Sequence, residues 1–443
     1  MDFKDLLLTP IYLPFIYLLA YWLRRKMADS VTRKYFFPAL SVKLIGAIFF
    51  GLIYQFYYGG GDTFNYFHDS QLIWQAFREE SPFTAFGLIF ADNQYHPELY
   101  KYTSQMHFYA DPNTYNVIRL SALLGFFTFH TYTLISLLFA LLSFTGVWAL
   151  FRVFYHLYPQ HHRKLAIAIF FIPSVFFWGS GLMKDPLTLG ALGWLFFGFY
   201  FGVIRRRKLV LNGLLIFACI LTIQAIKVYI LLCFLPAAFL WIFLEYRASI
   251  KSPLLRFASL PIVILLAIPL SYQAVVKVTE DNKRYQLENI TATTQVTATW
   301  LRQVGTMQGG SVYSLGEFDG TWSNMLAKAP QAVVVALYRP FLWEARNPVM
   351  LLSALEAAFF LFLTLKIFWE IKLGRLFTIF AKQPVLLFCL IFALTFSFAV
   401  GISSYNFGTL VRYKIPMMPF FLSALYIIRS QAVKKPKKVR RFA

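Results

Sequence analysis

Cysteine is scarce in this chain, whose 443 residues include only Cys219, Cys233 and Cys389. Each lies inside an apolar stretch and none has the spacing of metal ligands, so neither a disulfide framework nor a zinc module is expected. No small-residue cleavage signal follows the first apolar run, which predicts a retained membrane span rather than a signal peptide. The sequence also lacks an internal repeat of the kind that marks transporters built from two related halves.

Charged residues are scarce as well. They make up 14% of the chain, and 42 Lys and Arg outnumber 20 Asp and Glu to give a formal charge of +22. A basic balance of this size can indicate nucleic-acid binding. Here the basic residues come in short runs between apolar stretches, as the topology rule for membrane proteins predicts. No nucleic-acid partner is therefore expected.

Apolar residues are abundant: 58% of the chain is hydrophobic, 19% is aromatic, and the mean hydropathy is +0.58. A soluble core cannot bury this much apolar surface, so the predicted fold class is all-α, in a polytopic membrane protein. The apolar runs predict about eleven transmembrane helices, over residues 6–22, 36–57, 131–155, 165–178, 187–203, 209–226, 228–244, 256–270, 347–369, 383–400 and 413–429.

Placing the basic loops inside predicts a multi-pass protein of the cell (inner) membrane, with its N-terminus outside and its C-terminus cytoplasmic. We expect one integral membrane domain, 1–443, ending in a basic cytoplasmic tail, 430–443. Two long segments, 58–130 and 271–346, fall on the extracytoplasmic side and hold most of the acidic residues. Their apolar residues at helical spacing predict amphipathic helices along the membrane surface, and 322–340 is either interfacial or half-inserted.

Few ionisable side chains fall inside the predicted spans. Lys43 and Arg152 are the main ones, and both are near enough to the inner surface to snorkel. A transporter places charges where its substrate crosses the membrane, despite their cost. The polar groups of this chain instead gather at outer helix ends, which favours an enzyme that acts at one membrane face.

The segment GGGDTFNYFHDS, residues 59–70, follows the second predicted span. If a helix begins at Asp62, Asp69 projects from the same face and His68 lies about a quarter-turn away. Carboxylates and a histidine at a fixed depth can hold or move a proton, so Asp62, Asp69 and His68 are the candidate catalytic residues. The alternative is structural: Asp62 caps the helix and Asp69 is a solvated surface residue.

Cations stand at the outer ends of several other predicted helices. Lys184 precedes Asp185 in the hairpin SGLMKDP, and Lys227 lies at the tip of another hairpin. A lysine held near the membrane surface suits an anionic headgroup or a phosphate. The alternative for the first hairpin is a salt bridge between Lys184 and Asp185 at a wet turn.

Two further outer motifs carry arginine. Arg339 and Glu344 lie in YRPFLWE, and Arg412 and Lys414 lie in NFGTLVRYKIP. An arginine can bind a phosphate through two parallel hydrogen bonds, or can snorkel to the lipid headgroups. The candidate substrate- and phosphate-binding residues are therefore Lys184, Asp185, Lys227, Arg339, Glu344, Arg412 and Lys414.

The glycine turn with Asp62, the SGLMKD hairpin, RPFLWE and NFGTLVRYKIP together resemble the bacterial GT-C type multi-spanning glycosyltransferases and related polysaccharide-assembly proteins. The resemblance covers much of the chain as a pattern of spans, with short motifs. It implies transfer of a sugar from a polyprenyl-phosphate-linked donor to an acceptor at the extracytoplasmic face, in the synthesis of cell-surface polysaccharide or glycoconjugate.

Residue roles follow from this resemblance. Asp62 would be the base toward the acceptor hydroxyl and Asp69 a second acid, while the outer cations would bind the donor phosphate. A divalent cation, if the reaction uses one, would be held by Asp62 and Asp69. Sugar rings commonly stack on aromatic side chains, and the candidates by position are Tyr66, Trp74, Trp178 and Trp343.

Other functions stay open beside the transferase. A Wzy-type polysaccharide polymerase would join lipid-diphosphate-linked repeats through similar surface chemistry. A lipid or saccharide transporter would need a polar path through the helices. A non-catalytic assembly partner of a cell-surface complex would not need the outer motifs to share one substrate.

Overall fold

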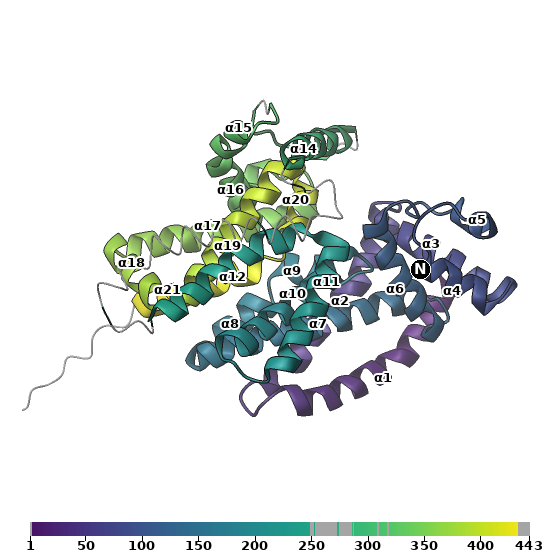
Figure 1. Cartoon of the computed structure of the whole chain (residues 1–443), viewed down its shortest axis with the longest axis horizontal. Helices are drawn as coiled ribbons and strands as arrows, with labels where there is room; N and C mark the ends of the chain where they lie inside the picture. The colour runs from purple at the N-terminus through teal and green to yellow at the C-terminus, as the bar shows by residue number, and fades with distance from the viewer. Residues whose placement is uncertain are drawn as a thin grey trace, which may run out of the picture. The chain divides into compact units, whose positions relative to one another are not determined.

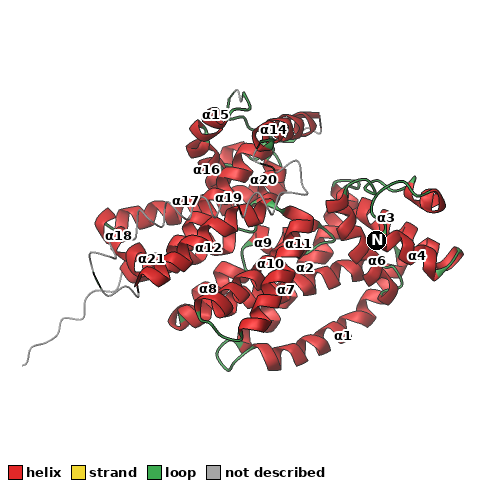
Figure 2. Ribbon diagram, in the orientation of Figure 1, coloured by secondary structure: helices red, strands yellow, loops and turns green. Residues whose placement is uncertain are grey.

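A computed structural model describes residues 2–248, 252, 273, 286, 288–307, 310–316 and 319–432. Within these ranges the protein is built of helices, and the one β-type pairing is an isolated bridge between Val312 and Asn406. Figure 2 accordingly shows helices joined by loops, with no strand among the described residues. The predicted all-helical fold class is confirmed. The predicted span 256–270 and the tail beyond residue 432 lie outside the described residues.

The chain divides into two compact units, and unit 1 comprises Met1–Leu157 and Pro173–Val228. Its helices, labelled in Figure 1 where space allows, are α1 (Phe3–Met27), α2 (Arg33–Leu52), the π-helical turn η1 (Ile53–Tyr57), α3 (Asp62–Glu79), α4 (Pro82–Phe90), the 3-10 turn η2 (Pro97–Leu99), α5 (Tyr100–Thr103), α6 (Pro112–Phe127), α7 (Tyr132–Leu157), α9 (Pro173–Trp178), α10 (Lys184–Gly198), the π-helical turn η4 (Phe199–Ile204) and α11 (Leu209–Lys227).

Unit 2 comprises Tyr158–Ile172 and Tyr229–Ala443. Its described helices are the 3-10 turn η3 (Pro159–His161), α8 (His162–Phe170), α12 (Tyr229–Ala248), α14 (Ile290–Met307), α15 (Trp322–Ala327), α16 (Ala329–Tyr338), the 3-10 turn η6 (Leu342–Glu344), α17 (Pro348–Glu370), α18 (Leu373–Lys382), α19 (Pro384–Ser404), α20 (Phe407–Tyr413) and α21 (Met418–Ala432).

Several helices are long and apolar enough to cross a membrane, as a polytopic protein requires. In the described ranges there are eight: Phe3–Met27, Arg33–Tyr57, Tyr132–Leu157, Lys184–Ile204, Leu209–Lys227, Tyr229–Arg247, Pro348–Glu370 and Pro384–Ser404.

The predicted number of eleven spans is not confirmed, and proline accounts for two of the differences. Residues 165–178 form α8 and α9 instead of one helix, because Pro173 lacks the N–H that a continuing helix needs. Residues 413–429 are broken around Pro416, so that α21 is only 15 residues long. At these two positions proline separates helices that the apolar pattern alone predicts to be continuous.

The backbones of α7 and α10 approach closely in unit 1 because glycines meet at their crossing. A Cβ at Gly146 would lie 1.8 Å from the carbonyl oxygen of Gly190, and one at Gly193 would lie 2.0 Å from that of Gly146. Since α11 packs on α10 in turn, this contact fixes the position of the N-terminal end of α10. Lys184 and Asp185 lie at that end.

The prediction that Lys43 snorkels to the inner surface is wrong. Its side chain is 3% exposed, and its ammonium donates hydrogen bonds to Ser143 Oγ at 2.8 Å and to the carbonyl oxygen of Gly179. Depth along α2 alone does not set the environment of this ammonium, because α7 and the turn after α9 enclose it. Arg152 is half-buried, with its guanidinium 5.2 Å from the centre of the Phe197 ring.

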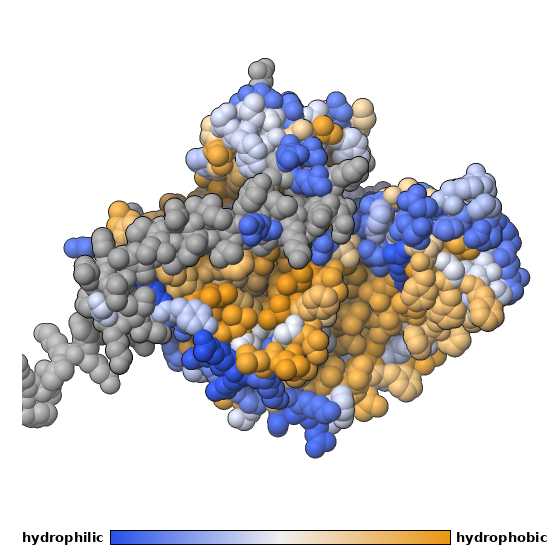
Figure 3. Space-filling view, viewed as in Figure 1, coloured by the Kyte–Doolittle hydropathy of each residue, from blue (hydrophilic) through white to orange (hydrophobic). Residues whose placement is uncertain are grey.

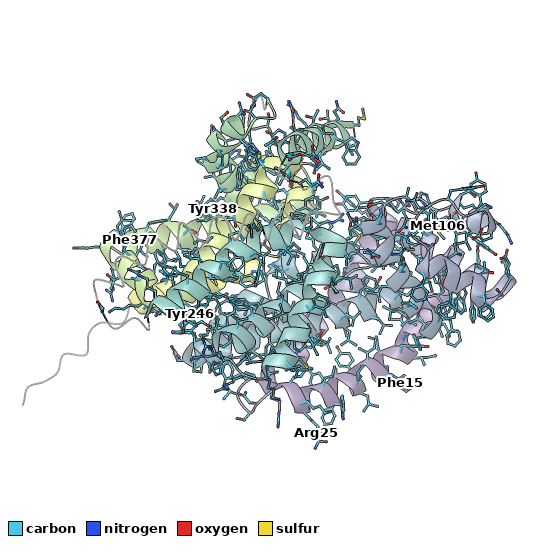
Figure 4. All side chains as sticks on the ribbon, in the orientation of Figure 1. Phe15, Arg25, Met106, Tyr246, Tyr338 and Phe377 are labelled. Carbon is cyan, nitrogen blue, oxygen red and sulfur yellow. The ribbon has the colours of Figure 1, made fainter. Side chains whose placement is uncertain are left out.

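α1 has many exposed apolar side chains, including Phe15, as expected for a helix that faces lipid. Its last turn is basic and contains Arg25, whereas Asp2 and Asp5 cap its first turn. Figure 3 shows hydrophilic residues around the basic end of α1 and around α5, and hydrophobic surface along α1. Figure 4 labels Arg25 at one of these ends and Met106, which follows α5, at the other. The loop after α5 therefore belongs to a polar end of unit 1 away from Arg25.

α19 occupies the centre of unit 2, where it packs against α12, α14, α16 and α21. A Cβ at Gly401 would lie 2.1 Å from the carbonyl oxygen of Ala332, so α16 and α19 are nearly in backbone contact. α8 packs against α21, and His161 Nε2 lies 3.0 Å from Ser430 Oγ. Residues 158–172 therefore belong with the C-terminal helices.

Candidate functional site

The glycine turn joins η1 to α3. Gly59, Gly60 and Gly61 have φ values of 70°, 134° and 127°, a backbone region that residues with a side chain rarely adopt. Gly61 is the N-cap of α3, and Asp62 is the first helical residue and half-buried. The structural alternative for Asp62 is therefore wrong, because a glycine occupies the cap position.

Asp69 is fully buried, although it was expected to be either a second acid or a solvated surface residue. Its Oδ1 accepts a hydrogen bond from the backbone N–H of His107 at 3.0 Å, and its Oδ2 accepts one from the N–H of Phe108 at 2.9 Å. The carboxylate thus anchors the loop between α5 and α6 on α3. Solvent exposure of Asp69 is excluded.

Two imidazoles meet this buried carboxylate. Oδ1 of Asp69 lies 3.0 Å from Nδ1 of His107 and 3.3 Å from Nδ1 of His68. The two rings lie 5.0 Å apart at an angle of 79°, and their side chains are 46% (His68) and 48% (His107) exposed. When Nδ1 carries the proton, Nε2 of each ring is left to accept a proton or a ligand. An exposed imidazole oriented by a buried carboxylate is suited to general base catalysis.

The same residues have the chemistry of a metal site. Ligand atoms of His68, Asp69 and His107 all lie within 4.8 Å of one another. Imidazole and carboxylate ligands suit Zn²⁺ or a similar transition ion, which would replace the hydrogen bonds at Nδ1. Asp62 lies about 10 Å along the helix axis from Asp69, since each residue rises 1.5 Å. Those two carboxylates therefore cannot bind the same ion. The cation site at Asp62 and Asp69 that the sequence resemblance implies is excluded.

The two candidate lysines of unit 1 form ion pairs that the sequence did not predict. Lys184 Nζ lies 3.6 Å from Oδ2 of Asp111, and Lys227 Nζ lies 2.5 Å from Oδ1 of Asp185. The Lys227–Asp185 pair is buried, with side-chain exposures of 7% and 1%. The expected alternative, a wet salt bridge between Lys184 and Asp185, is replaced by pairs that join α10 to α6 and to α11.

One loop links the two groups of polar residues. His107 contacts Asp69 on α3, and four residues later Asp111 caps α6 and pairs with Lys184 on α10. Four residues of chain span at most about 14 Å. α6 is also joined to α11, because Asn116 Nδ2 donates to the carbonyl oxygen of Ala225 at 3.1 Å. The loop therefore holds the imidazoles and the Lys184 ammonium in the same region of unit 1.

Arg339 and Glu344 form an ion pair within unit 2. Arg339 Nε donates to Glu344 Oε2 at 2.9 Å and its Nη2 donates to Oε1, so the guanidinium is held on both carboxylate oxygens. Burial raises the pKa of the Glu344 carboxyl, but the hydrogen bonds from Arg339 and from the Phe341 N–H outweigh burial and leave the pKa below its usual value. Arg339 also lies 5.1 Å from the centre of the Phe407 ring.

The last pair of predicted cations also lies in unit 2. Arg412 is half-buried, with its guanidinium 5.7 Å from the centre of the Tyr413 ring. Lys414 is fully buried, and its ammonium has no hydrogen-bond partner among the residues that the structure describes. Glu356 of α17, 8% exposed, interacts with it electrostatically. Glu356 lies inside the predicted span 347–369 and is not among the sequence candidates.

The four aromatic candidates for sugar stacking differ in exposure. Tyr66 and Trp178 are 3% and 7% exposed, so both belong to the protein core. Trp343 is 81% exposed and stacks on Phe341 in unit 2. Trp74 is half-buried in unit 1 and is the aromatic candidate there with accessible surface.

His107 and Asp111 were not among the sequence candidates. The sequence did contain a signal for Asp111, because an aspartate before Pro112 is typical of an N-cap followed by the first helical residue. His107 has no comparable signal. It lies in an irregular loop, 38 positions from Asp69, and local periodicity predicts no contact over that separation.

His130 provides a pH-dependent contribution to stability. It is 5% exposed, and its Nε2 lies 3.0 Å from Ser70 Oγ. Burial, together with the charge of Lys4, lowers the pKa of His130 from 6.5 to about 3.

The folded state therefore favours neutral His130, and the stability from this group is complete above pH 6.5. It is lost as the pH falls from about 6.5 toward 3, at up to about 1.4 kcal/mol per pH unit. We expect the melting temperature in detergent to fall between pH 7 and pH 4, and His130→Gln to flatten this dependence. An equally steep fall in the variant would contradict the assignment.

The comparisons with known proteins place no relative beside this geometry. No protein-family model, no curated protein and no solved structure matches the chain.

Proposed function

We propose that this chain is a membrane glycosyltransferase that moves a sugar from a polyprenyl-phosphate-linked donor to an acceptor hydroxyl at the extracytoplasmic face. The observation that carries the proposal is the buried carboxylate of Asp69, which orients the exposed imidazoles of His68 and His107. The resemblance of the outer motifs to GT-C type enzymes supplies the substrate class. The membrane helices are in keeping with a lipid-linked donor.

The chemistry needs a proton acceptor and a site for the leaving phosphate. The acceptor oxygen would form a bond to the anomeric carbon of the sugar while the bond from that carbon to the phosphate oxygen breaks. The phosphate leaves with the bonding electron pair, and the proton of the acceptor hydroxyl passes to Nε2 of His107. A positioned base contributes about 10²- to 10⁴-fold to such a rate.

Lys184 is the group we assign to the phosphate. It is the first residue of α10, where both the ammonium and the N-terminus of a 15-residue helix favour negative charge. Charge stabilisation of this kind acts most strongly on the departing group in the transition state. The ion pair with Asp111 keeps the ammonium near the loop that carries His107.

Asp62 and His107 are rival proton acceptors, since the sequence resemblance assigns this role to Asp62. The test uses the purified chain in liposomes with a membrane glycolipid extract and a labelled polyprenyl-phosphate hexose, and measures the release of polyprenyl phosphate. We expect His107→Ala to slow release strongly and Asp62→Asn to have the smaller effect. The reverse order would return the role to Asp62, and absence of release by the wild-type chain would contradict the transferase.

Buried charges within the membrane helices favour a transporter as the second candidate. Lys43 lies inside α2 and Glu356 inside α17, and both are under 10% exposed. Intramembrane ionisable residues commonly mark ion or substrate pathways. Uptake of a labelled saccharide into liposomes that is lost in Glu356→Gln and kept in His107→Ala would favour transport over transfer.

A further inference from the structure

A polar cavity, called the chamber below, lies beside α3 on the side away from Asp69. Its volume is about 270 Å³, and its walls come from the start of α1, the second half of α3 and the turn before α7. Residues 67, 71, 74 and 78 recur at helical spacing and form one face of α3, nearly opposite the face that carries Asp69. The cavity is therefore separate from the imidazoles of His68 and His107.

An apolar groove of about 500 Å³ adjoins this cavity. Leu8 and Phe129 contribute only to the groove, whereas Lys4, Trp74 and Arg78 line both spaces. Two cations and an indole thus stand where the polar cavity meets the apolar groove. A ligand that occupies both spaces must be amphipathic, and its linking group must suit positive charge.

The two cations differ in how they are held. The Lys4 ammonium donates to the carbonyl oxygen of Phe129, which positions it, and an ammonium has three donors. The Arg78 side chain is exposed and makes no hydrogen bond or ion pair with another residue in the described ranges. Its planar guanidinium can donate two parallel hydrogen bonds to a phosphate.

The chamber offers both donors and acceptors beyond the junction. Gln71 and Gln75 each provide an amide, and Glu79 provides a carboxylate. Hydroxyl groups donate and accept hydrogen bonds, so a headgroup with several hydroxyls fits such a mixture. Asp2 also lines the chamber, but its carboxylate is engaged in the cap of α1 with Asp5.

The walls are fixed by contacts around Trp74 and α1. The Trp74 ring stacks on Phe77 with centroids 5.8 Å apart and lies 6.3 Å from His130. Tyr12 OH donates to the carbonyl oxygen of Phe127 at 2.9 Å, and Asp5 Oδ1 accepts from the N–H of Thr133 at 2.7 Å. These bonds tie the first half of α1 to the turn before α7, so the chamber and groove are preformed.

We propose that this site binds an amphiphile in which a phosphate joins a hydroxylated headgroup to an apolar chain. The phosphate lies between Lys4 and Arg78, the headgroup lies in the chamber against Trp74, and the chain lies in the groove along Leu8 and Phe129. Two sources share this chemistry, a glycerol-headed phospholipid and a lipid-linked sugar. Binding at this site does not depend on the proposed transfer reaction.

The test measures equilibrium binding by the full chain in nanodiscs of neutral phosphatidylcholine. The probes are a short-chain phosphatidylglycerol, farnesyl-phosphate hexose, hexose 1-phosphate and an octyl hexoside. We expect one or both of the phosphate-linked amphiphiles to bind, and the two incomplete probes to bind at least tenfold more weakly. Preference for phosphatidylglycerol would identify a bilayer lipid, and preference for the farnesyl compound would identify a lipid-linked sugar.

Variants test the assigned residues. Arg78→Gln and Trp74→Ala should each weaken the bound amphiphile about tenfold or more. The matched controls are Trp22→Ala and Lys26→Met, because Lys26 Nζ lies 3.6 Å from the Trp22 ring near the other end of α1. Unchanged binding in Arg78→Gln, which alters an exposed residue, would overturn the proposal, as would equal binding of hexose 1-phosphate.

This result is distinguishable from failure of the proposed function. Loss of sugar release in His107→Ala with unaltered binding in Arg78→Gln would refute the amphiphile site and leave the transferase intact. If binding depends on Arg78 but the chain releases no polyprenyl phosphate, the amphiphile site is supported and the transferase is refuted.

Discussion

Replacing His107 by alanine is expected to lower the rate of sugar transfer by about 10²-fold or more, because the variant lacks the proposed proton acceptor. The backbone N–H groups of His107 and Phe108 bind the Asp69 carboxylate without needing the imidazole, so the loop should keep its place. The measurement is the release of polyprenyl phosphate from labelled donor as a function of pH. Loss of a base should remove the acidic limb of the rate profile, which a purely structural defect would not do.

His96→Ala is the matched control for this prediction. His96 also lies in the predicted segment 58–130 and is also paired with an aspartate, since its Nε2 lies 2.8 Å from Oδ1 of Asp92. The His96→Ala variant should transfer sugar at the wild-type rate. His68 and His107 contact the same carboxylate. The rate loss in the double variant His68→Ala/His107→Ala should therefore be smaller than the product of the losses in the two single variants. Wild-type transfer by His107→Ala would refute the imidazole as base.

Replacing Lys227 by methionine is expected to destabilise the protein by about 3 to 5 kcal/mol, because it removes the ammonium from a buried carboxylate. Asp185 is 1% exposed and its Oδ1 lies 2.5 Å from the Lys227 ammonium. Water cannot replace the lost partner at such a site. The measurement is the free energy of unfolding, or the loss of folded protein, in detergent micelles.

A double substitution tests whether loss of the ion pair, and not altered packing, causes the destabilisation. Lys227→Met combined with Asp185→Asn removes both charges and should recover most of the lost stability, since a buried pair replaced by neutral groups costs little. Lys101→Met is the control, because Lys101 pairs with Glu80 at 2.7 Å on the exposed surface. It should produce no measurable change. A double variant no more stable than Lys227→Met would show that the ion pair is not the cause.

Much of the helical framework could be predicted from the sequence. Apolar runs such as 131–155 and 383–400 became α7 and α19, because a span of sufficient length is a local property of the chain. The failures have two causes, one local and one tertiary. Pro173 and Pro416 break apolar runs, and Lys43 and Glu356 are buried within helices that periodicity could not orient.

The candidate site was predicted in part. The glycine turn, the start of a helix near Asp62 and the polar character of the segment around Asp69 were all visible in the sequence. The burial of Asp69 was not visible, because it depends on a loop 38 positions away. Four of the predicted cationic and acidic residues, Arg339, Glu344, Arg412 and Lys414, lie in a different unit from Asp62.

The sequence by itself determined that this is a helical membrane protein with its polar residues concentrated between the spans, because length, hydropathy and basic runs act over a few turns of chain. The tertiary structure decided which polar groups meet. His107 reaches Asp69, Asp111 reaches Lys184, and Lys227 reaches Asp185 only when α3, α6, α10 and α11 pack together. Such partners are set by helix packing between distant segments, and no local pattern in one sequence specifies them.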